Sequence, residues 1–387
     1  MRLLIPLLLI GCGEVTGKLP DAPPGSGEDA ADAAPLGCGD GIRTPGEVCY
    51  KPPVTIQTGV AAYDAQFADM DSDGDLDVVF TGGAVIRTHI NSNGVFAPTS
   101  IAGAATTGPW TLAKDFNNDQ KVDVAVAGAT AAGGHVVSMY RGDGTAHQTP
   151  AGAFNLGIEA MAIGSGDVMG SGEMLVTFDA RSVRIYVIST DLGIDTVDSD
   201  VFALMATGAV GKVDADNFAD LVAGGGNGVV LFRGGTGGLS PLIETPMVNP
   251  AVAVAIGDIN GDAMGDIAYT QVDPTNGMAL LGMLPGAGSG AFLEPVTMPI
   301  TGASPGLQLA DVDGDGKQDL IAGTGIRTGV RIDVLLGTAT GFAAPVSLPL
   351  TADTDYLHTG DYNKDQAPDI IVTNAKLQRI TIFESNP

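Results

Sequence analysis

Carboxylates fall at every second position of Asp69-Met-Asp-Ser-Asp-Gly-Asp-Leu-Asp77, and a glycine stands at the sixth position. A hard divalent cation needs several oxygen ligands at once, and alternate side chains of a tight loop can converge on one ion. The stretch is therefore predicted to be a calcium loop. It is not an EF-hand loop, because Phe80 stands at its twelfth position, where an EF-hand has a bidentate glutamate.

The same pattern recurs along the chain. Four further intact copies are Asp115-Phe-Asn-Asn-Asp-Gln-Lys-Val-Asp123, Asp258-Ile-Asn-Gly-Asp-Ala-Met-Gly-Asp266, Asp311-Val-Asp-Gly-Asp-Gly-Lys-Gln-Asp319 and Asp361-Tyr-Asn-Lys-Asp-Gln-Ala-Pro-Asp369. Two copies, at 167–175 and 212–220, have lost some of these residues. The seven loops, first to seventh, begin at positions 69, 115, 167, 212, 258, 311 and 361. Such regular spacing predicts a repeat architecture.

Each copy is followed by short apolar runs that favour β-strands. In the sixth repeat they lie at 320–322 and 331–336, and a Gly-rich turn leads to a third run, 341–345, with an aromatic residue and a proline, as in 290–295 of the fifth repeat. A run of small residues, such as 251–256, precedes the next loop. Four strands per repeat predict an all-β fold, a seven-bladed β-propeller of four-stranded antiparallel blades, with the small-residue run nearest the crowded axis.

The end of the chain predicts how the ring closes. Two strand-like runs, 369–373 and 379–383, follow the last loop, and the outer strand of that blade is missing. Residues 50–58 have the character of the missing strand. We expect them to complete the seventh blade, which would leave no open sheet edge.

The first residues resemble an export signal. Arg2 precedes an apolar run, 3–10, that is too short to span a bilayer, so residues 1–11 are predicted to be a signal peptide. The run ends in Leu9-Ile10-Gly11-Cys12, which resembles the lipobox of bacterial lipoproteins and implies lipidation of Cys12. The alternative is an ordinary secretory signal with a chance cysteine. Gly13, where enteric inner-membrane lipoproteins have aspartate, favours an outer-membrane or cell-surface location.

Two segments separate this anchor from the repeats. Residues 12–37 are rich in Gly, Pro, Ala and Asp, so they are predicted to be a flexible tether. In residues 38–49, we expect Cys38 and Cys49 of an exported protein to form a disulfide rather than two free thiols. Their pattern, Cys-Gly-Asp-Gly followed by Gly-Glu and a second Cys, resembles the Cys-rich repeat of myxobacterial surface proteins. Tyr50-Lys51 depart from that repeat, because acidic residues usually stand there.

Over residues 50–387 the chain resembles the FG-GAP/VCBS-repeat family, the seven-bladed propellers that include the integrin α-subunit head. The loop spacing and the recurring Gly…Phe…Pro segments carry the resemblance. It implies that the loop joins the first two strands of each blade. It also implies that side chains at loop positions one, three, five and nine bind calcium together with the backbone carbonyl of position seven, giving about five structural Ca²⁺ ions.

The implied ligands include five residues that act through the backbone carbonyl: Asp75, Lys121, Met264, Lys317 and Ala367. The side-chain ligands are Asp69, Asp71, Asp73 and Asp77; Asp115, Asn117, Asp119 and Asp123; Asp258, Asn260, Asp262 and Asp266; Asp311, Asp313, Asp315 and Asp319; and Asp361, Asn363, Asp365 and Asp369. Position six is glycine in the first and sixth loops, but Gln120, Ala263 or Gln366 in the others. If that position requires positive φ, these three residues are strained there, and we expect weaker calcium binding.

The two degenerate loops differ from each other. In the third, Met169 and Leu175 occupy ligand positions, so we expect no ion there. In the fourth, Lys212 stands at position one beside three aspartates, and its ammonium is hypothesised to replace the metal as a counter-charge. The alternative for every loop is an Asp/Asn turn that needs no metal.

The charge and the motifs of the chain exclude several classes of function. A formal net charge of −27 over 387 residues argues against binding to nucleic acid or to an anionic membrane surface. The sequence has no zinc-type histidine pair and no nucleophile elbow.

We expect a monomeric, calcium-stabilised, non-catalytic binding or adhesion protein, with an extracellular protein or polysaccharide as partner and membrane contact only through the lipid. The alternatives are a carbohydrate-binding lectin and a polysaccharide-processing enzyme. Trp110 is expected to pack in the core or to face an axial pocket.

Overall fold

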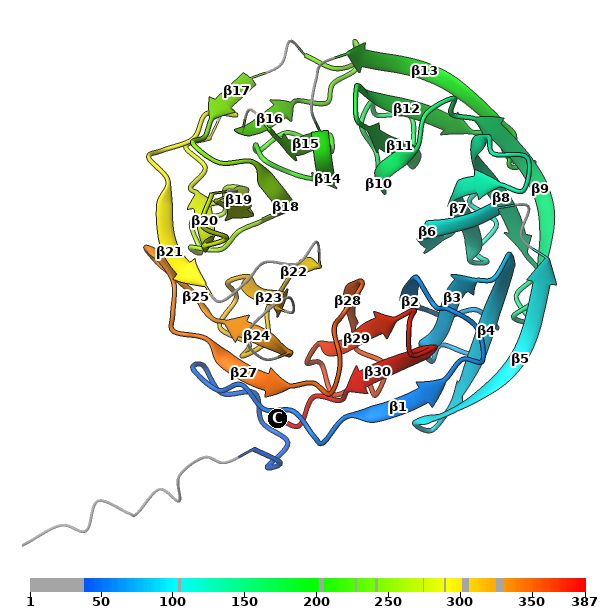
Figure 1. Ribbon diagram of the computed structural model, residues 1–387, viewed down its shortest axis with the longest axis horizontal. Coiled ribbons are helices and arrows are strands. Elements are labelled where there is room, and N and C mark those ends of the chain that lie inside the picture. Colours follow the sequence, from blue (N-terminus) through cyan, green and yellow to red (C-terminus); the bar gives the residue numbers. More distant parts are fainter. Residues whose placement is uncertain are drawn as a thin grey trace, which may run out of the picture. The chain divides into compact units, whose positions relative to one another are not determined.

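The computed structural model describes residues 38–387 except 104–105, 202–204, 227, 241–242, 274, 289, 301–305 and 325–329. Within these residues the chain forms strands and no helix, and the strands make seven four-stranded antiparallel sheets. The sheets surround a central axis as the blades of a propeller (Figure 1), which confirms the predicted fold. The expected signal peptide, lipidated Cys12 and tether lie outside the described residues. No described segment is a helix that is long and apolar enough to cross a membrane.

Each blade has four strands, which follow one another from the axis outward. The first four blades are β2 (Asp64–Ala68), β3 (Asp77–Gly82), β4 (Val85–Ser92) and β5 (Val95–Gly103); β6 (Thr106–Lys114), β7 (Asp123–Thr130), β8 (His135–Gly142) and β9 (Gln148–Asn155); β10 (Ala160–Gly166), β11 (Met174–Asp179), β12 (Ser182–Ile188) and β13 (Ile194–Val201); and β14 (Met205–Gly211), β15 (Asp220–Gly225), β16 (Gly228–Phe232) and β17 (Ile243–Pro246). The last three are β18 (Ala251–Gly257), β19 (Asp266–Val272), β20 (Ala279–Leu284) and β21 (Val296–Ile300); β22 (Leu307–Ala310), β23 (Asp319–Thr324), β24 (Arg331–Leu335) and β27 (Val346–Pro349); and β28 (Leu357–Gly360), β29 (Asp369–Asn374), β30 (Arg379–Phe383) and β1 (Val54–Gln57).

The burial of a strand follows from its place in the blade. The second strands are mostly apolar, and β3 and β29 are buried at every residue, as expected where both faces of a sheet are covered. Outer strands such as β17 alternate between exposed and partly buried residues. Apolar side chains of adjacent blades meet in shared clusters; Val79 and Ile86 of the first blade, for example, pack with Val124 and Val126 of the second. The core therefore lies between the blades.

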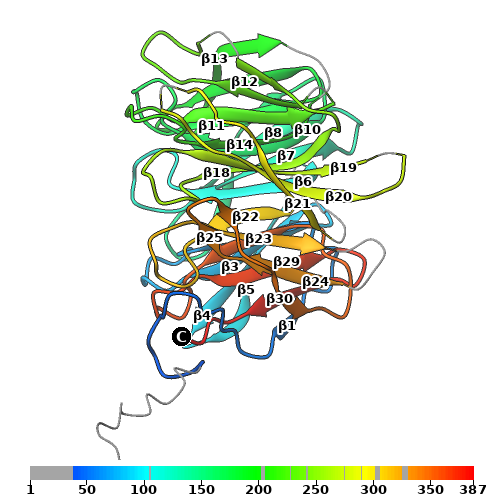
Figure 2. The ribbon, with the colours of Figure 1, turned by 90° about the vertical axis from the view of Figure 1, so that its left-hand side faces the viewer.

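The N-terminal strand closes the ring. β1 pairs antiparallel with β30, so that Ile56 lies opposite Ile380, and an isolated bridge joins Tyr50 to Ser385. The edge-on view in Figure 2 shows the blue β1 beside the red β30. The predicted completion of the seventh blade by the N-terminal stretch is confirmed.

The predicted positions of some outer strands are wrong. In the fifth and sixth blades, the outer strands β21 and β27 follow the Gly…Phe…Pro segments that the sequence suggested as strands. Phe342 lies instead in a short hairpin of β25 (Gly337–Thr338) and β26 (Gly341–Phe342), and Phe292 forms an isolated bridge with Gly286 ahead of β21. Both rings pack against inter-blade cores. Glycine and proline interrupt the strand there, and the aromatic ring holds the turn against the blade.

Candidate metal centres

Each loop connects the innermost strand of a blade to its second strand. The first loop lies between β2 and β3, and its ninth residue, Asp77, is the first residue of β3. Because all seven sheets have the same order and sense, the seven loops lie on the same face of the ring. Loops of neighbouring blades also touch, since Lys364 of the seventh loop forms an ion pair with Asp75 of the first. The loops therefore form a rim on one face of the ring, and the rim is acidic at the five intact loops.

In each intact loop, aspartate carboxylates accept hydrogen bonds from backbone N–H groups of the same loop. In the first loop, Asp69 accepts hydrogen bonds from the N–H groups of Asp73 (3.1 Å) and Gly74 (3.0 Å). Asp73 accepts one from the N–H of Asp75 at 2.8 Å. The second, fifth and seventh loops repeat the contacts of position one with positions five and six. These are the local turns that aspartate favours, and they orient the remaining oxygens toward the loop centre.

The ninth aspartate has a role that the sequence did not reveal. Asp77 is fully buried, and its two oxygens accept hydrogen bonds from the N–H groups of Met70 (2.9 Å) and Asn91 (2.8 Å). The carboxylate thus ties the start of the loop to the end of the third strand. The same pair of contacts is made by Asp123, Asp220, Asp266, Asp319 and Asp369.

Burial perturbs the titration of these aspartates. It raises the pKa of Asp77, Asp123 and Asp319 to about 6, and that of Asp369 to about 7, against the hydrogen bonds that lower it. Neighbouring loop carboxylates also raise the pKa, as Asp71 and Asp73 do for Asp77. A cation beside the group would favour its ionised form. The loops therefore gather charge that a bound cation would stabilise.

Position six adopts a left-handed backbone in all five intact loops. Gln120, Ala263 and Gln366 have φ of 66°, 64° and 69°, so the condition for their expected strain is met. The sequence did not indicate that position four is left-handed as well. Its φ is positive at Ser72, Asn118, Gly261, Gly314 and Lys364. Two such residues in one tight loop bring the alternate side chains together.

Replacing Gln366 with glycine is expected to raise the free energy of unfolding by about 0.5–1 kcal/mol, because glycine adopts this backbone without a Cβ penalty. The reverse change, Gly316→Ala at φ of 88°, should lower it by at least as much. Urea denaturation in the presence of a chelator measures both. Destabilisation by Gln366→Gly would contradict the assignment of strain.

The five intact loops offer calcium two kinds of oxygen set. In the first and sixth loops three carboxylates converge, since ligand oxygens of Asp69, Asp71 and Asp77 lie within 4.8 Å of one another, as do those of Asp311, Asp313 and Asp315. In the other three intact loops, the side-chain nitrogen at position three donates to the aspartate at position five, and these residues are Asn117, Asn260 and Asn363. Carboxylate and amide oxygens are the ligands that calcium prefers.

The two degenerate loops are stabilised by contacts that differ from those of the intact loops. In the third, Leu175 is buried in an inter-blade core and Asp167 accepts hydrogen bonds from backbone N–H groups, so the absence of an ion there stays a prediction. In the fourth, Arg233 Nη1 lies 3.6 Å from Asp214 Oδ2. Among the described residues Lys212 makes no ion pair within 4.0 Å, so its role as a counter-charge stays a hypothesis, and Arg233 is a cation beside the loop that the sequence did not indicate. Arg233 follows β16, whose end lies beside the loop.

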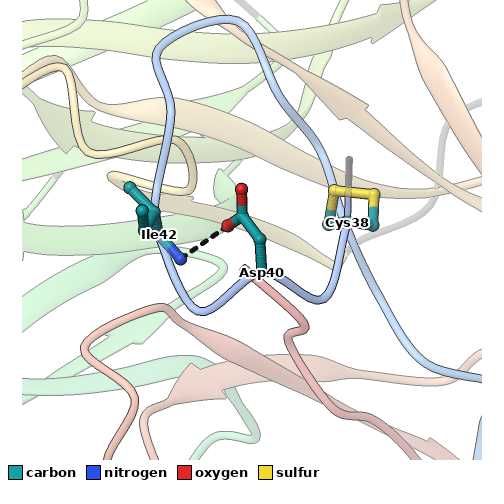
Figure 3. Close-up of a disulfide and its surroundings, with 4 residues drawn as sticks. Cys38, Asp40 and Ile42 are labelled. Carbon is teal, nitrogen blue, oxygen red and sulfur yellow. Dashed lines mark hydrogen bonds between the residues drawn. A yellow bond between two sulfur atoms is a disulfide. The ribbon is translucent and has the colours of Figure 1, made fainter. Parts of the chain in front are cut away.

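The Cys-rich segment docks on the sixth loop. Cys38 and Cys49 form a disulfide with Cα atoms 5.3 Å apart, and Asp40 accepts a hydrogen bond from the N–H of Ile42 within the enclosed turn (Figure 3). From this segment, Arg43 Nη2 lies 3.0 Å from Asp311 Oδ1. The N–H of Gly46 donates to Asp313 Oδ2 at 2.6 Å. Two expected calcium ligands therefore also hold the N-terminal segment.

Replacing Arg43 with alanine is expected to lower the free energy of unfolding in chelator by about 2 kcal/mol, because several charge-assisted hydrogen bonds to partly buried groups are lost. They go to the Asp311 carboxylate and to the carbonyls of Val312 and Gln366. The control is Lys51→Ala, which breaks a more exposed ion pair with Glu384 and should cost less than about 1 kcal/mol. Equal losses in urea denaturation would contradict the docking role.

Sequence reasoning also missed the apolar residue at position two of every loop. The residues are Met70, Phe116, Val168, Val213, Ile259, Val312 and Tyr362, and all are buried. They fix each loop to the inter-blade core, including the two loops that have lost ligand residues. The signal was present, because position two is apolar in all seven copies.

Comparisons with known proteins agree with this architecture. A family model described as an FG-GAP-like repeat matches residues 311–372. Among solved structures, the chain is similar to BBS1N in its complex with ARL6DN, in crystals soaked with lead or mercury. Identity is 15% in both cases, the TM-scores are 0.62 and 0.60, and the matches cover 89% and 88% of this chain and 98% and 97% of those chains. No curated protein sequence matches. The protein is a seven-bladed β-propeller that carries an FG-GAP-like repeat.

Proposed function

We propose that the protein is a calcium-stabilised, non-catalytic binding or adhesion protein, held at the cell surface by a lipid on Cys12. The observation that carries this proposal is the recurrence of one oxygen-rich loop geometry in five blades of a closed ring. An FG-GAP propeller is compatible with binding and adhesion, because a rigid scaffold presents many surface loops for recognition. The partner is an extracellular protein or polysaccharide, and the protein acts as a monomer.

Calcium has a structural role in this proposal. Without a cation, the acids of one loop repel one another, and burial already disfavours the ionised form of the ninth aspartate. An ion in each intact loop would offset this repulsion and bind the first strand to the second. The loop side chains are occupied in these contacts, which supports a non-catalytic role for the rim.

A lectin function has less support from the described residues. Phe96, Phe292 and Phe342 recur in similar positions of their blades, but each packs against an inter-blade core. A sugar-binding platform needs an aromatic face that is open to solvent. These three rings stabilise the blades instead.

Surface exposure and adhesion can be tested together in cells. Intact cells treated with a protease are expected to lose the protein on an immunoblot, and a deletion strain is expected to adhere less to protein- and polysaccharide-coated surfaces. Complementation with the wild type should restore adhesion, whereas Cys12→Ser should leave the protein unanchored and fail to restore it. Protection of the protein in intact cells, with normal adhesion of the deletion strain, would overturn the proposal.

A further inference from the structure

A cavity of about 280 Å³ lies on the propeller axis. Its wall is formed by the innermost strands β2, β6, β10, β14, β18, β22 and β28, one from each blade (Figure 1). A second cavity of about 220 Å³ shares Trp110, Thr207 and Tyr356 with the first. The calcium loops follow the carboxyl ends of these strands, while Glu159 and Tyr356 precede the amino ends. The shared mouth therefore lies on the face opposite the calcium loops.

The axial cavity has a mixed lining in which the two titratable groups lie together. Asp64 and His358 come from the first and seventh blades, and further polar side chains, Gln66, Thr111, Ser165, Thr207 and Gln308, come from the first, second, third, fourth and sixth blades. Apolar side chains of the third to sixth blades also line the cavity, among them Ile163, Val210, Val254, Ile256 and Leu309. Asp64 is 2% exposed; its Oδ1 lies 2.7 Å from His358 Nε2, and its Oδ2 accepts a hydrogen bond from the N–H of Thr111 at 2.9 Å. A buried carboxylate, fixed by its two partners, thus lines a cavity with a large apolar share.

Aromatic rings and carboxylates surround the mouth. The rings of Trp110 and Tyr356 meet edge to face with centroids 4.8 Å apart, although they come from the second and seventh blades. Trp110 is fixed by a hydrogen bond from Nε1 to the carbonyl of Ala160 at 2.9 Å. The exposed Glu159 lines the same cavity. Burial raises the pKa of Tyr356, and the negative charges of Asp64, Asp355 and Glu159 raise it further.

We propose that this axial site binds a small organic cation with an apolar portion, of the quaternary ammonium type. Trp110 and Tyr356 line both cavities, and the face of an aromatic ring attracts such a cation without needing hydrogen bonds from it. Glu159 supplies a negative charge at the mouth, and the apolar side chains of the wall accept the hydrocarbon part. Among the described lining residues His358 is the one basic side chain, and its Nε2 is held by Asp64. The site therefore favours a cation over an anion.

The single tryptophan of the chain makes the site directly observable, because Trp110 is the only one. The full-length protein in calcium is titrated with choline and, separately, with 3,3-dimethylbutan-1-ol, in which carbon replaces the charged nitrogen. Choline is expected to change the tryptophan emission saturably, and the neutral alcohol to bind roughly tenfold more weakly or not at all. Equal binding of the alcohol would overturn the proposal, as would the lack of both a saturable fluorescence change and a calorimetric signal with choline.

Matched variants assign the binding to these residues. Glu159→Gln should weaken choline binding severalfold, whereas Glu244→Gln, an equal charge change at an exposed position on the outer strand β17, should leave it unchanged. Tyr356→Phe should retain binding, and Tyr356→Leu should weaken it about tenfold. Equal effects of the two glutamate variants would show a nonspecific charge effect and overturn the site. Binding of methyl glucoside in place of choline would overturn the ligand class. Glu159 is exposed, so its variant tests the site even where Tyr356→Leu does not fold.

Discussion

Replacing Asp319 with alanine is expected to lower the free energy of unfolding by about 3 kcal/mol in chelator, and by more in calcium. The Asp319 side chain is fully buried. Its two oxygens accept hydrogen bonds from the N–H groups of Val312 and Gly337, each at 2.7 Å. Alanine leaves both buried donors unpaired, at a cost of about 1–3 kcal/mol each, partly offset by removal of a buried charge. In calcium the variant also loses an expected ligand.

Two further variants separate the hydrogen bonds from the metal. Asp220 makes the same contacts, with the N–H groups of Val213 (2.7 Å) and Gly234 (3.0 Å), in a loop without an intact ligand set. We expect Asp220→Ala to cost about 3 kcal/mol with or without calcium. Asp71→Ala, which removes a partly exposed carboxylate, should destabilise only in calcium. Chemical denaturation in calcium and in chelator measures all three. A loss for Asp319→Ala that is confined to calcium would contradict the hydrogen-bonding role.

Deletion of residues 1–57 is expected to cost about 5 kcal/mol beyond the loss of the Cys-rich segment and to promote self-association. The deletion removes β1, whose four residues Val54–Gln57 pair with β30. The estimate combines about 1 kcal/mol for each lost hydrogen bond with about 2 kcal/mol for the apolar side chain of Ile56. The seventh blade would keep three strands, and β30 would become an unpaired edge that can bind another chain.

Deletion of residues 1–49 is the matched control, because it removes the Cys-rich segment and keeps β1. It should cost only about 2 kcal/mol, the value expected for Arg43→Ala, and leave the protein monomeric. Calorimetry and light scattering compare the two truncated proteins. Equal stability of the two would show that β1 does not close the ring.

Much of the fold could be predicted from local pattern. The loop recurs once in each blade, so its seven copies give the number of blades directly. The seventh repeat lacks its outer strand, and this correctly indicated that residues 50–58 supply the fourth strand of the seventh blade. The outer strands of the fifth and sixth blades were misplaced, because Phe292 and Phe342 sit in β-like segments whose glycines and prolines form turns.

The remaining contacts depend on ring closure and leave no local signal. Arg43 reaches Asp311 across 268 positions, and His358 reaches Asp64 across 294. Trp110 meets Tyr356 because their blades lie near each other around the axis. No spacing rule relates such residues. The second bond of the ninth aspartate was hidden for a similar reason, since Asn91, the donor to Asp77, lies 14 positions away at the end of β4.

The calcium content of the purified protein, measured together with thermal melts in calcium and in chelator, tests the central claim most directly. We predict about five ions per chain, and a fall in Tm of roughly 10 °C or more on chelation, because an ion that binds only the folded chain stabilises it. A protein with no bound calcium, or one that melts at the same temperature in chelator, would contradict the claim and reduce the loops to aspartate-rich turns.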